Sequence, residues 1–339
     1  MQLASYYISL EDDTVQCQLC PHQCILSADQ YGRCNTRVNR RGKLYTESYG
    51  VLSAISNDPI EKKPLYHFFP GRPILSIGSF GCNMACDFCQ NCEISQITPQ
   101  LLSHHPVREP WDIVGKAIVQ KENIGLAYTY NEPSVFYEFM VQCAAQIKAH
   151  KRYNVMVTNG FINREPLEAL IPYMDAFNVD LKSFRDEFYR SRSKAKLRPV
   201  LDTIQRIARS DVHLELTFLI IPGLNDSAEE WEDMIRWIHG TCGPDAILHV
   251  SRYFPRHKLR NPPTPLETLQ NFVDLAAGRI NYLYPGNTPQ LESHTYCPKC
   301  RTILIQRNLY HSKIVGIGPE GCCTNCHTPI QGVFNEPNQ

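Results

Sequence analysis

The chain of 339 residues is long enough for one sizeable domain with small appendages, and its 43% hydrophobic content is ordinary for a globular protein. Its 34 Lys and Arg residues balance its 34 Asp and Glu residues, which excludes nucleic-acid recognition through a global basic charge and leaves room only for a local basic patch. No apolar run approaches the length of a membrane span, and the first residues lack a signal-peptide pattern, so we expect a cytoplasmic protein that does not enter a membrane.

Cysteine is unusually frequent, with 15 residues in the chain. In a cytosolic protein such a count favours metal binding over disulfide bonds. Most of the cysteines fall into three groups: Cys17, Cys20, Cys24 and Cys34; Cys82, Cys86, Cys89 and Cys92; and Cys297, Cys300, Cys322, Cys323 and Cys326. Cys143 and Cys242 are isolated, and we interpret them as buried or inert thiols.

Residues 1–50 form a short, polar segment that contains the first cysteine group. Closely spaced cysteines followed by a distant one suit a tetrahedral site, and Gly32 permits the turn that returns the last ligand. A segment of this size has little core of its own, so a bound metal is its expected source of stability. We predict a zinc ion or an auxiliary iron–sulfur cluster at Cys17, Cys20, Cys24 and Cys34; the alternative is a flexible arm with free thiols.

From residue 70 onward, short β-branched or aromatic runs alternate with amphipathic stretches. The predicted strands are 74–79, 125–130, 153–158, 176–181, 213–220, 246–250 and 281–284. The predicted helices are Trp111–Asn123, Ser134–His150, Leu197–Ala208, Ala228–His239 and Pro265–Ala277. Repeated β–α units indicate a parallel sheet with helices outside it. We therefore predict an α/β fold, a partial TIM barrel over residues 70–284, with cysteine-rich, metal-binding appendages at 1–50 and 285–339.

The second cysteine group directly follows the first strand of this predicted barrel. Its spacing is Cys82-x3-Cys86-x2-Cys89, which differs from the paired C-x2-C of zinc ribbons and from ferredoxin spacings. Three thiolates are one short of the four that normally hold a cubane iron–sulfur cluster, so one iron would be free to bind another group. The alternative is a zinc knuckle or a chance run of cysteines.

Polar residues follow almost every predicted strand, at the edge where parallel sheets carry their active sites. Any single polar loop is weak evidence, but regular placement around one edge is stronger. The residues concerned are Glu132, Thr158, Asn159, Asp180, Lys182 and His249.

Beyond residue 285 the alternating pattern ends, and two cysteine knuckles appear about twenty residues apart. Cys297 with Cys300 and Cys323 with Cys326 give the spacing of a zinc-ribbon or rubredoxin-like site for zinc or iron, which leaves Cys322 spare. We interpret this site as a structural staple.

Taken together, these motifs resemble the radical SAM enzymes of the AmmeMemoRadiSam system, which are relatives of the pyruvate formate-lyase activating enzymes. The resemblance covers nearly the whole chain. It rests on the Cys-x2-Cys-Pro-His-x-Cys segment at 17–24, on residues 81–91 and 127–133, on Asp180-Leu181-Lys182, on 221–226 and 249–252, and on the Tyr-Cys-Pro-x-Cys of 296–300.

The resemblance implies that Cys82, Cys86 and Cys89 ligate a [4Fe–4S] cluster whose open iron binds S-adenosylmethionine. It further implies that reductive cleavage of this cofactor yields a 5′-deoxyadenosyl radical, which abstracts hydrogen from a substrate. By the same resemblance the cofactor contacts are Glu132, Thr158, Asn159, Asp180, Lys182 and His249. Two positions depart from the family pattern: Val157 stands where activating enzymes often carry Asp, which puts their monovalent-cation site in doubt, and Cys92 stands where Trp is expected.

The resemblance also implies partners. These are an electron donor such as flavodoxin or ferredoxin, together with Memo-type and AMME-type proteins. It leaves the substrate open among a glycine of a partner protein, a small metabolite and an RNA base. The rival interpretation is a non-enzymatic zinc-binding adaptor in which all three cysteine groups are structural.

Overall fold

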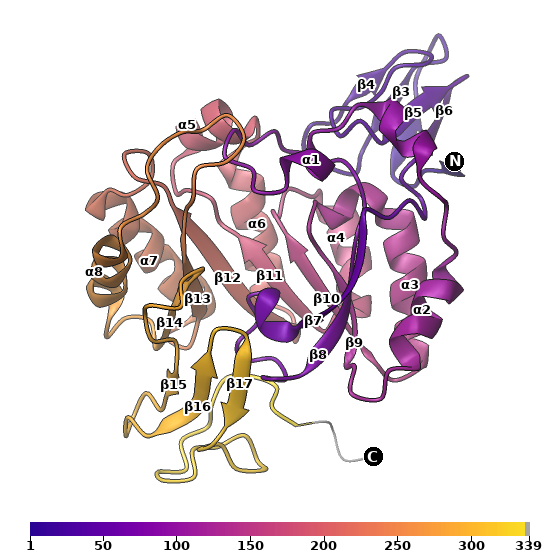
Figure 1. Ribbon diagram of the computed structural model, residues 1–339. Coiled ribbons are helices and arrows are strands. Elements are labelled where there is room, and N and C mark those ends of the chain that lie inside the picture. Colours follow the sequence, from indigo (N-terminus) through magenta and orange to yellow (C-terminus); the bar gives the residue numbers. More distant parts are fainter. Residues whose placement is uncertain (336–339) are drawn as a thin grey trace.

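The computed structural model describes residues 1–335 and is built around one eight-stranded sheet with the order β14-β13-β12-β11-β10-β9-β8-β7 (Figure 1). The strands of this sheet are β7 (Ala54–Pro59), β8 (Pro73–Gly78), β9 (Gly125–Tyr128), β10 (Tyr153–Thr158), β11 (Ala176–Asp180), β12 (His213–Ile220), β13 (Ile247–Arg252) and β14 (Tyr282–Gly286). From β8 to β14 neighbouring strands pair in parallel, whereas β7 pairs antiparallel to β8. The predicted α/β fold with a mostly parallel sheet is confirmed.

The parallel strands form where the sequence carries short runs of apolar residues buried on both faces, as parallel sheets require. All of β9 is buried, and so are nearly all residues of β8 and β11. Strand β7 was not predicted, because its sequence Ala-Ile-Ser-Asn-Asp-Pro is largely polar; half of its residues are exposed, as suits an edge strand. Because strand order follows chain order, the carboxyl ends of β8 to β13 meet at one edge.

Helices cover the outside of the sheet, in an arc from α2 and α3 to α7 and α8 (Figure 1). Their apolar positions recur at helical spacing, as in α6, where Val200, Ile204 and Ile207 are buried. The α-helices are α1 (Cys92–Ser95), α2 (Pro110–Ile118), α3 (Tyr137–Ala149), α4 (Arg164–Leu170), α5 (Asp186–Phe188), α6 (Leu197–Ala208), α7 (Ala228–Cys242) and α8 (Leu266–Ala276). Short 3-10 or π turns are η1 (Ile60–Lys62), η2 (Pro99–His104), η3 (Pro133–Phe136), η4 (Ile171–Tyr173) and η5 (Tyr189–Ser193). Among residues 1–335, no helix combines the length and apolarity that crossing a bilayer requires.

The N-terminal segment folds into two small sheets that sit beside the carboxyl-end edge of the barrel (Figure 1). Their strands are β1 (Gln2–Leu3), β2 (Tyr7–Ser9), β3 (Val15–Cys17), β4 (Ile25–Leu26), β5 (Arg37–Arg40) and β6 (Lys43–Thr46). The segment is joined to α3 by a buried ion pair of 2.6 Å between Arg37 Nη2 and Glu138 Oε1. We call residues 1–50 the N-terminal module.

The C-terminal segment forms a third small sheet of β15 (Thr295–Tyr296), β16 (Ile303–Asn308) and β17 (His311–Ile314). Its apolar residues pack with Tyr66, Tyr282 and Tyr284 of the barrel. Buried His67 is the polar link: its Nδ1 donates to the Gln331 carbonyl at 2.6 Å, and its Nε2 accepts from the Tyr284 hydroxyl at 2.5 Å. The described part of this C-terminal module is therefore docked on the barrel by both apolar and polar contacts.

Candidate functional site

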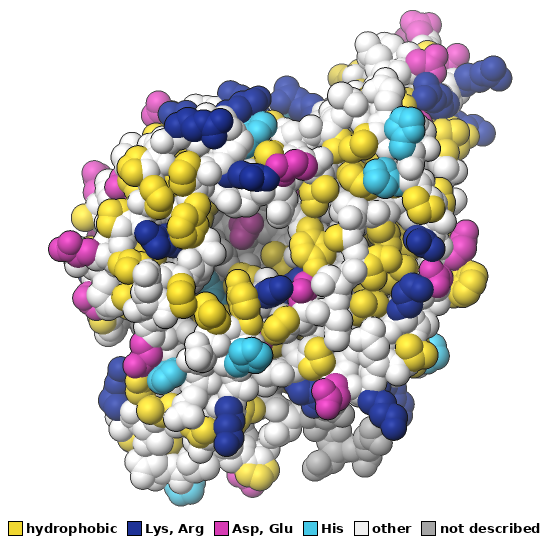
Figure 2. Space-filling model, viewed as in Figure 1, with side chains coloured by type: hydrophobic (Ala, Val, Ile, Leu, Met, Phe, Trp, Pro, Cys, Tyr) yellow, Lys and Arg dark blue, Asp and Glu magenta, His cyan; other side chains and the backbone are white. Residues whose placement is uncertain are grey.

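A cavity of about 780 Å³ lies on the inner side of the sheet, toward the carboxyl ends of the strands. The face of the molecule in Figure 2 is hollowed over the middle of this sheet. The thiols of Cys82, Cys86 and Cys89 line the cavity, together with every residue predicted as a cofactor contact: Glu132, Thr158, Asn159, Asp180, Lys182 and His249. The structure thus brings together side chains that lie more than 160 positions apart in sequence.

The loop that carries the three cysteines is braced from several sides. Asn131, just beyond β9, accepts from Ser79 N at 2.9 Å and donates to Gly81 O at 2.8 Å. On the far side, Asp87 pairs with Arg192 at 3.0 Å. Gly81 has φ +85°, and a Cβ there would lie 2.5 Å from Cys34 O of the N-terminal module. Only glycine therefore fits this conformation and this close approach.

The spacing of the three thiols suits a cluster better than a single ion. Four sulfurs around one zinc, at Zn–S distances of about 2.3 Å, lie about 3.8 Å apart. Within residues 1–335, the C-terminal cysteines bring their sulfurs within 4.8 Å of one another. The sulfurs of Cys82, Cys86 and Cys89 do not come this close together. A multi-iron core needs wider spacing, and three thiolates leave one iron without a protein ligand. The residues present therefore fit a [4Fe–4S] cluster.

Glu132 is a buried carboxylate with three protein donors. The Thr158 hydroxyl lies 2.9 and 3.0 Å from its two oxygens, Asn159 N donates at 2.8 Å, and Ser134 N donates at 3.0 Å. Burial raises the pKa of Glu132, and the hydrogen bonds from Asn159, Ser134 and Thr158 oppose that rise. A carboxylate has about four acceptor sites, so Glu132 can accept one more hydrogen bond from a cationic donor.

Thr158 and Asn159 line the cavity and also contact other residues of the site. The Asn159 side chain donates to Asn83 Oδ1 at 2.9 Å and lies 3.6 Å from Cys82 Sγ. It also accepts from Phe161 N at 2.9 Å. The polar turn after β10 therefore connects the Glu132 carboxylate to the cysteine loop.

Asp180 and Lys182 form an ion pair at the end of β11, with Nζ to Oδ2 at 3.0 Å. Burial alone would lower the pKa of Lys182, but Asp180 and the nearby Cys86 thiol raise it above its usual value. The Lys182 ammonium therefore stays charged inside the cavity wall, where it can attract an anionic group.

His249 belongs to a buried network that sequence reasoning missed. Its Nε2 lies 2.6 Å from Glu215 Oε2, and that carboxylate also accepts from His213, from Tyr66 N and from His67 N. Against the effect of burial, the hydrogen bonds from His213 and His249 lower the pKa of Glu215. The sequence signal for this network is Glu215 itself, a single acidic residue within the apolar run of β12, because a buried charge needs partners.

A second group that sequence reasoning missed lines the cavity from strand β7. Asp58 of strand β7 accepts from Lys63 Nζ at 2.8 Å and from the Tyr130 hydroxyl at 2.5 Å. Burial acts to raise the pKa of Asp58, but the hydrogen bonds from Lys63 and Tyr130 and the charges of Lys63 and Lys62 hold it well below its usual range. These residues line the same cavity and give part of its wall charged side chains.

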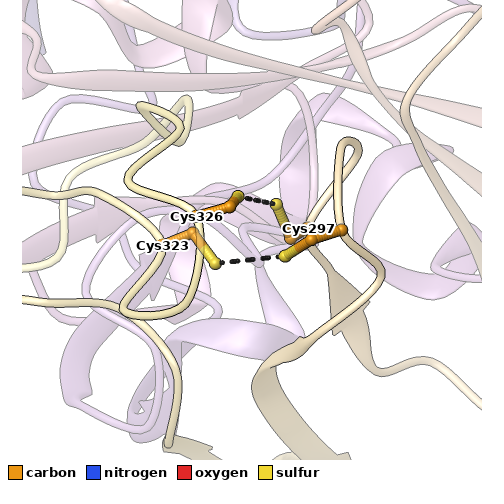
Figure 3. A group of neighbouring side chains, drawn as sticks. Cys297, Cys323 and Cys326 are labelled. Carbon is orange, nitrogen blue, oxygen red and sulfur yellow. Dashed lines mark hydrogen bonds between the residues drawn. The ribbon is translucent and has the colours of Figure 1, made fainter.

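The two outer cysteine groups differ from each other in geometry. In the C-terminal module, the sulfurs of Cys297 and Cys326 lie 3.5 Å apart and those of Cys300 and Cys323 lie 3.6 Å apart (Figure 3). These four residues are the ones predicted for this site, and Cys322 is not among them. This close spacing fits one tetrahedral ion, either zinc or iron. In the N-terminal module, Cys17, Cys20, Cys24 and Cys34 line one small pocket. His22 lines it as well, and its Nε2 lies 2.7 Å from Asn83 O.

Comparison with known proteins agrees with this geometry. The family model described as "Radical SAM superfamily" matches residues 76–238. "Uncharacterized protein MJ0808" of Methanocaldococcus jannaschii is 40% identical over 325 residues, which cover 94% of this chain and 96% of that protein. The "4-hydroxyphenylacetate decarboxylase activating enzyme" of Clostridioides difficile is 24% identical over 121 residues, 35% of this chain and 38% of that protein. A radical SAM methyltransferase from Sphaerobacter thermophilus has the same fold, with a TM-score of 0.52, 14% identity and coverage of 67% of this chain and 70% of that one.

Proposed function

Because this chain belongs to the radical SAM superfamily, we propose that it is an enzyme that cleaves S-adenosylmethionine reductively and uses the resulting 5′-deoxyadenosyl radical to take hydrogen from a substrate. The observation that carries the proposal is the single cavity shared by the thiols of Cys82, Cys86 and Cys89 and the polar ends of the neighbouring strands. A zinc adaptor would not need three widely spaced thiols inside a ligand-sized cavity.

In this proposal Cys82, Cys86 and Cys89 hold a [4Fe–4S] cluster, and S-adenosylmethionine binds beside them. When bound, the cluster and its cofactor supply the radical chemistry, while the protein supplies binding, orientation and exclusion of water. The braced loop fixes the three thiols relative to the strand ends, which sets the position of the reacting groups.

Glu132 and Lys182 have charges that match the two ends of an amino-acid moiety. The remaining acceptor site of Glu132 suits an ammonium group, and the Lys182 ammonium suits a carboxylate. Thr158 and Asn159 hold Glu132 in position, Asp180 keeps Lys182 charged, and His249 is fixed by Glu215 on the cavity wall. None of these residues needs to act as a general base.

We further propose that the partners are those suggested by the AmmeMemoRadiSam resemblance: an electron donor such as flavodoxin or ferredoxin, and Memo-type and AMME-type proteins. The substrate is a glycine of a partner protein, a small metabolite or an RNA base. Support comes from the motifs that span the chain from Cys17 to Cys300. A cavity of about 780 Å³ lies within the range of pockets that enclose one drug-sized ligand. S-adenosylmethionine is itself a ligand of that size, so little of the cavity is left for the substrate.

Replacing Cys86 with alanine tests the proposal. The variant should lose one cluster's worth of iron and all production of 5′-deoxyadenosine, measured on anaerobic protein with a chemical reductant. Cys242→Ala, which alters an isolated thiol at the end of α7, should change neither. A colourless wild-type protein that contains only zinc would instead support the adaptor, and 5′-deoxyadenosine at the normal rate from Cys86→Ala would refute the assignment of the cluster.

A further inference from the structure

The N-terminal module encloses a second sulfur-lined pocket, separate from the main cavity. Cys17, Cys20, Cys24 and Cys34 all line it. The space inside that the centre of a water molecule can reach is about 20 Å³. One water needs about 10–15 Å³, so the pocket has room for at least one water-sized group. A single ion held by four sulfurs leaves no such space between them.

The spacing of the four sulfurs leads to the same conclusion. The C-terminal cysteines, in the same structure, show the contraction expected around one ion, with sulfurs 3.5 and 3.6 Å apart. Among the described residues, no three ligand atoms of the N-terminal group lie within 4.8 Å of one another. In this respect the N-terminal group behaves like Cys82, Cys86 and Cys89, whose spacing fits a multi-iron core.

One wall of the pocket is formed by a residue without a side chain. Gly32 lies between two of the ligand candidates: a Cβ there would lie 3.8 Å from both Cys24 Sγ and Cys34 Sγ. The Thr36 hydroxyl lies 3.2 Å from Cys34 Sγ, a hydrogen bond that supports a sulfur acting as a ligand. The Arg37 guanidinium, 1% exposed, also lines the pocket, and its Nε has no hydrogen-bond partner in the described part of the chain.

The pocket shares a wall with the radical site. Asn83, the residue after Cys82, lines it, and His22 of the module contacts the Asn83 carbonyl at 2.7 Å. Cys34 itself touches the glycine that precedes Cys82. The N-terminal sulfurs are thus packed directly against the loop that carries the catalytic cysteines.

From these observations we propose that Cys17, Cys20, Cys24 and Cys34 hold a second iron–sulfur cluster and not a zinc ion. Four thiolates complete the usual ligand set of such a cluster, so no iron is left open to bind S-adenosylmethionine. The second cluster therefore cannot replace the first in cofactor cleavage. The inference does not depend on the proposed reaction, because it concerns only what the N-terminal sulfurs bind.

The test counts inorganic sulfide, which clusters contain and which single zinc or iron ions bound to cysteine lack. The starting protein is the full chain with Cys82, Cys86 and Cys89 all replaced by alanine, reconstituted without oxygen. We expect it to retain acid-labile sulfide, about two per chain for a [2Fe–2S] core or about four for a [4Fe–4S] core, with matching iron. Zinc without sulfide in this protein would overturn the proposal.

Two further variants of the same protein locate the cluster. Adding Cys20→Ala should abolish the remaining sulfide, whereas adding Cys242→Ala should leave it unchanged. Gly32→Val tests whether loss of sulfide could come from unfolding alone. The variant keeps all four thiols, and valine is tolerated by the backbone because Gly32 does not occupy the left-handed region. Its methyl groups should exclude the cluster from a protein that still melts cooperatively, and full sulfide retention in Gly32→Val would contradict a cluster in this pocket.

Discussion

Replacing Thr158 with valine is expected to make S-adenosylmethionine binding more sensitive to acid. The Thr158 hydroxyl lies 2.9 and 3.0 Å from the two oxygens of Glu132, to which it donates its one hydrogen, and it accepts from Gly160 N at 3.1 Å. Valine keeps the volume while removing this donor. A hydrogen bond to a charged group contributes about 1.5–3 kcal/mol. Its loss disfavours the ionised carboxylate, whose pKa burial already raises.

The magnitude follows from that energy. Since about 1.4 kcal/mol corresponds to one pH unit, the acid limb of the affinity profile should move to higher pH by about one to two units in Thr158→Val. The sign is fixed by chemistry: an ammonium needs the ionised carboxylate, so affinity is present above the pKa of Glu132 and falls about tenfold per pH unit below it.

The assay is anaerobic equilibrium binding of S-adenosylmethionine across the mildly acidic to neutral range, on protein with a confirmed iron content. Thr264→Val is the matched control, because the buried Thr264 hydroxyl also donates once, to Ile220 O at 2.6 Å, and accepts once, from Tyr253 N at 2.8 Å, away from the cavity. Identical profiles for wild type and Thr158→Val, or an equal displacement in Thr264→Val, would refute the role given to Glu132.

The other predictions concern charge, metal and pH. Lys182→Met should weaken S-adenosylmethionine binding roughly tenfold at unchanged iron content, from the loss of one charge-assisted contact, and equal affinity by calorimetry would contradict this. Cys300→Ser should release the C-terminal metal and lower the melting temperature while the visible spectrum of the central cluster persists; loss of that spectrum in a folded variant would count against a purely structural site. Burial lowers the pKa of His67 to about 3, whereas in the unfolded chain the pKa is about 6.5. As the pH falls from about 6.5, the unfolded chain therefore binds a proton that the folded chain does not, and the free energy of unfolding should drop by up to about 1.4 kcal/mol per pH unit until the pH reaches about 3. His67→Gln should lessen that slope in denaturant titrations, and an unchanged slope would show that His67 titrates normally.

The central fold could be predicted from sequence because its elements have strong local patterns. The run His213–Ile220 and the amphipathic stretch Leu197–Ala208 have the same bounds in prediction and structure. Strand β7 could not be predicted, because an exposed edge strand needs no apolar alternation and its pairing is set by β8 alone. The small sheets of the N-terminal module were hidden for a similar reason, since strands of two to four residues carry no period.

The site was predictable where residues follow a strand and unpredictable where contacts cross between elements. Cys82 and Glu132 could be identified from motif and position, and both line the cavity. The Glu215 network depends on backbone amides of Tyr66 and His67, nearly 150 positions away in sequence. The partnership of Asp58 with Tyr130 likewise exists only once β7 has paired with β8.

The hairpin of β16 and β17 has a consequence for access to the cavity. The sheet is open, with β7 and β14 as its edges, and residues of both edge strands line the cavity. Tyr310, at the tip of the hairpin, lines it as well, and Lys62 Nζ lies 5.5 Å from the centre of its ring. The C-terminal cysteines hold the far end of the sheet that carries this tip. Because Tyr310 and these cysteines belong to the same small sheet, loss of the fold around the cysteines is expected to shift Tyr310 and so to reshape the wall of the cavity.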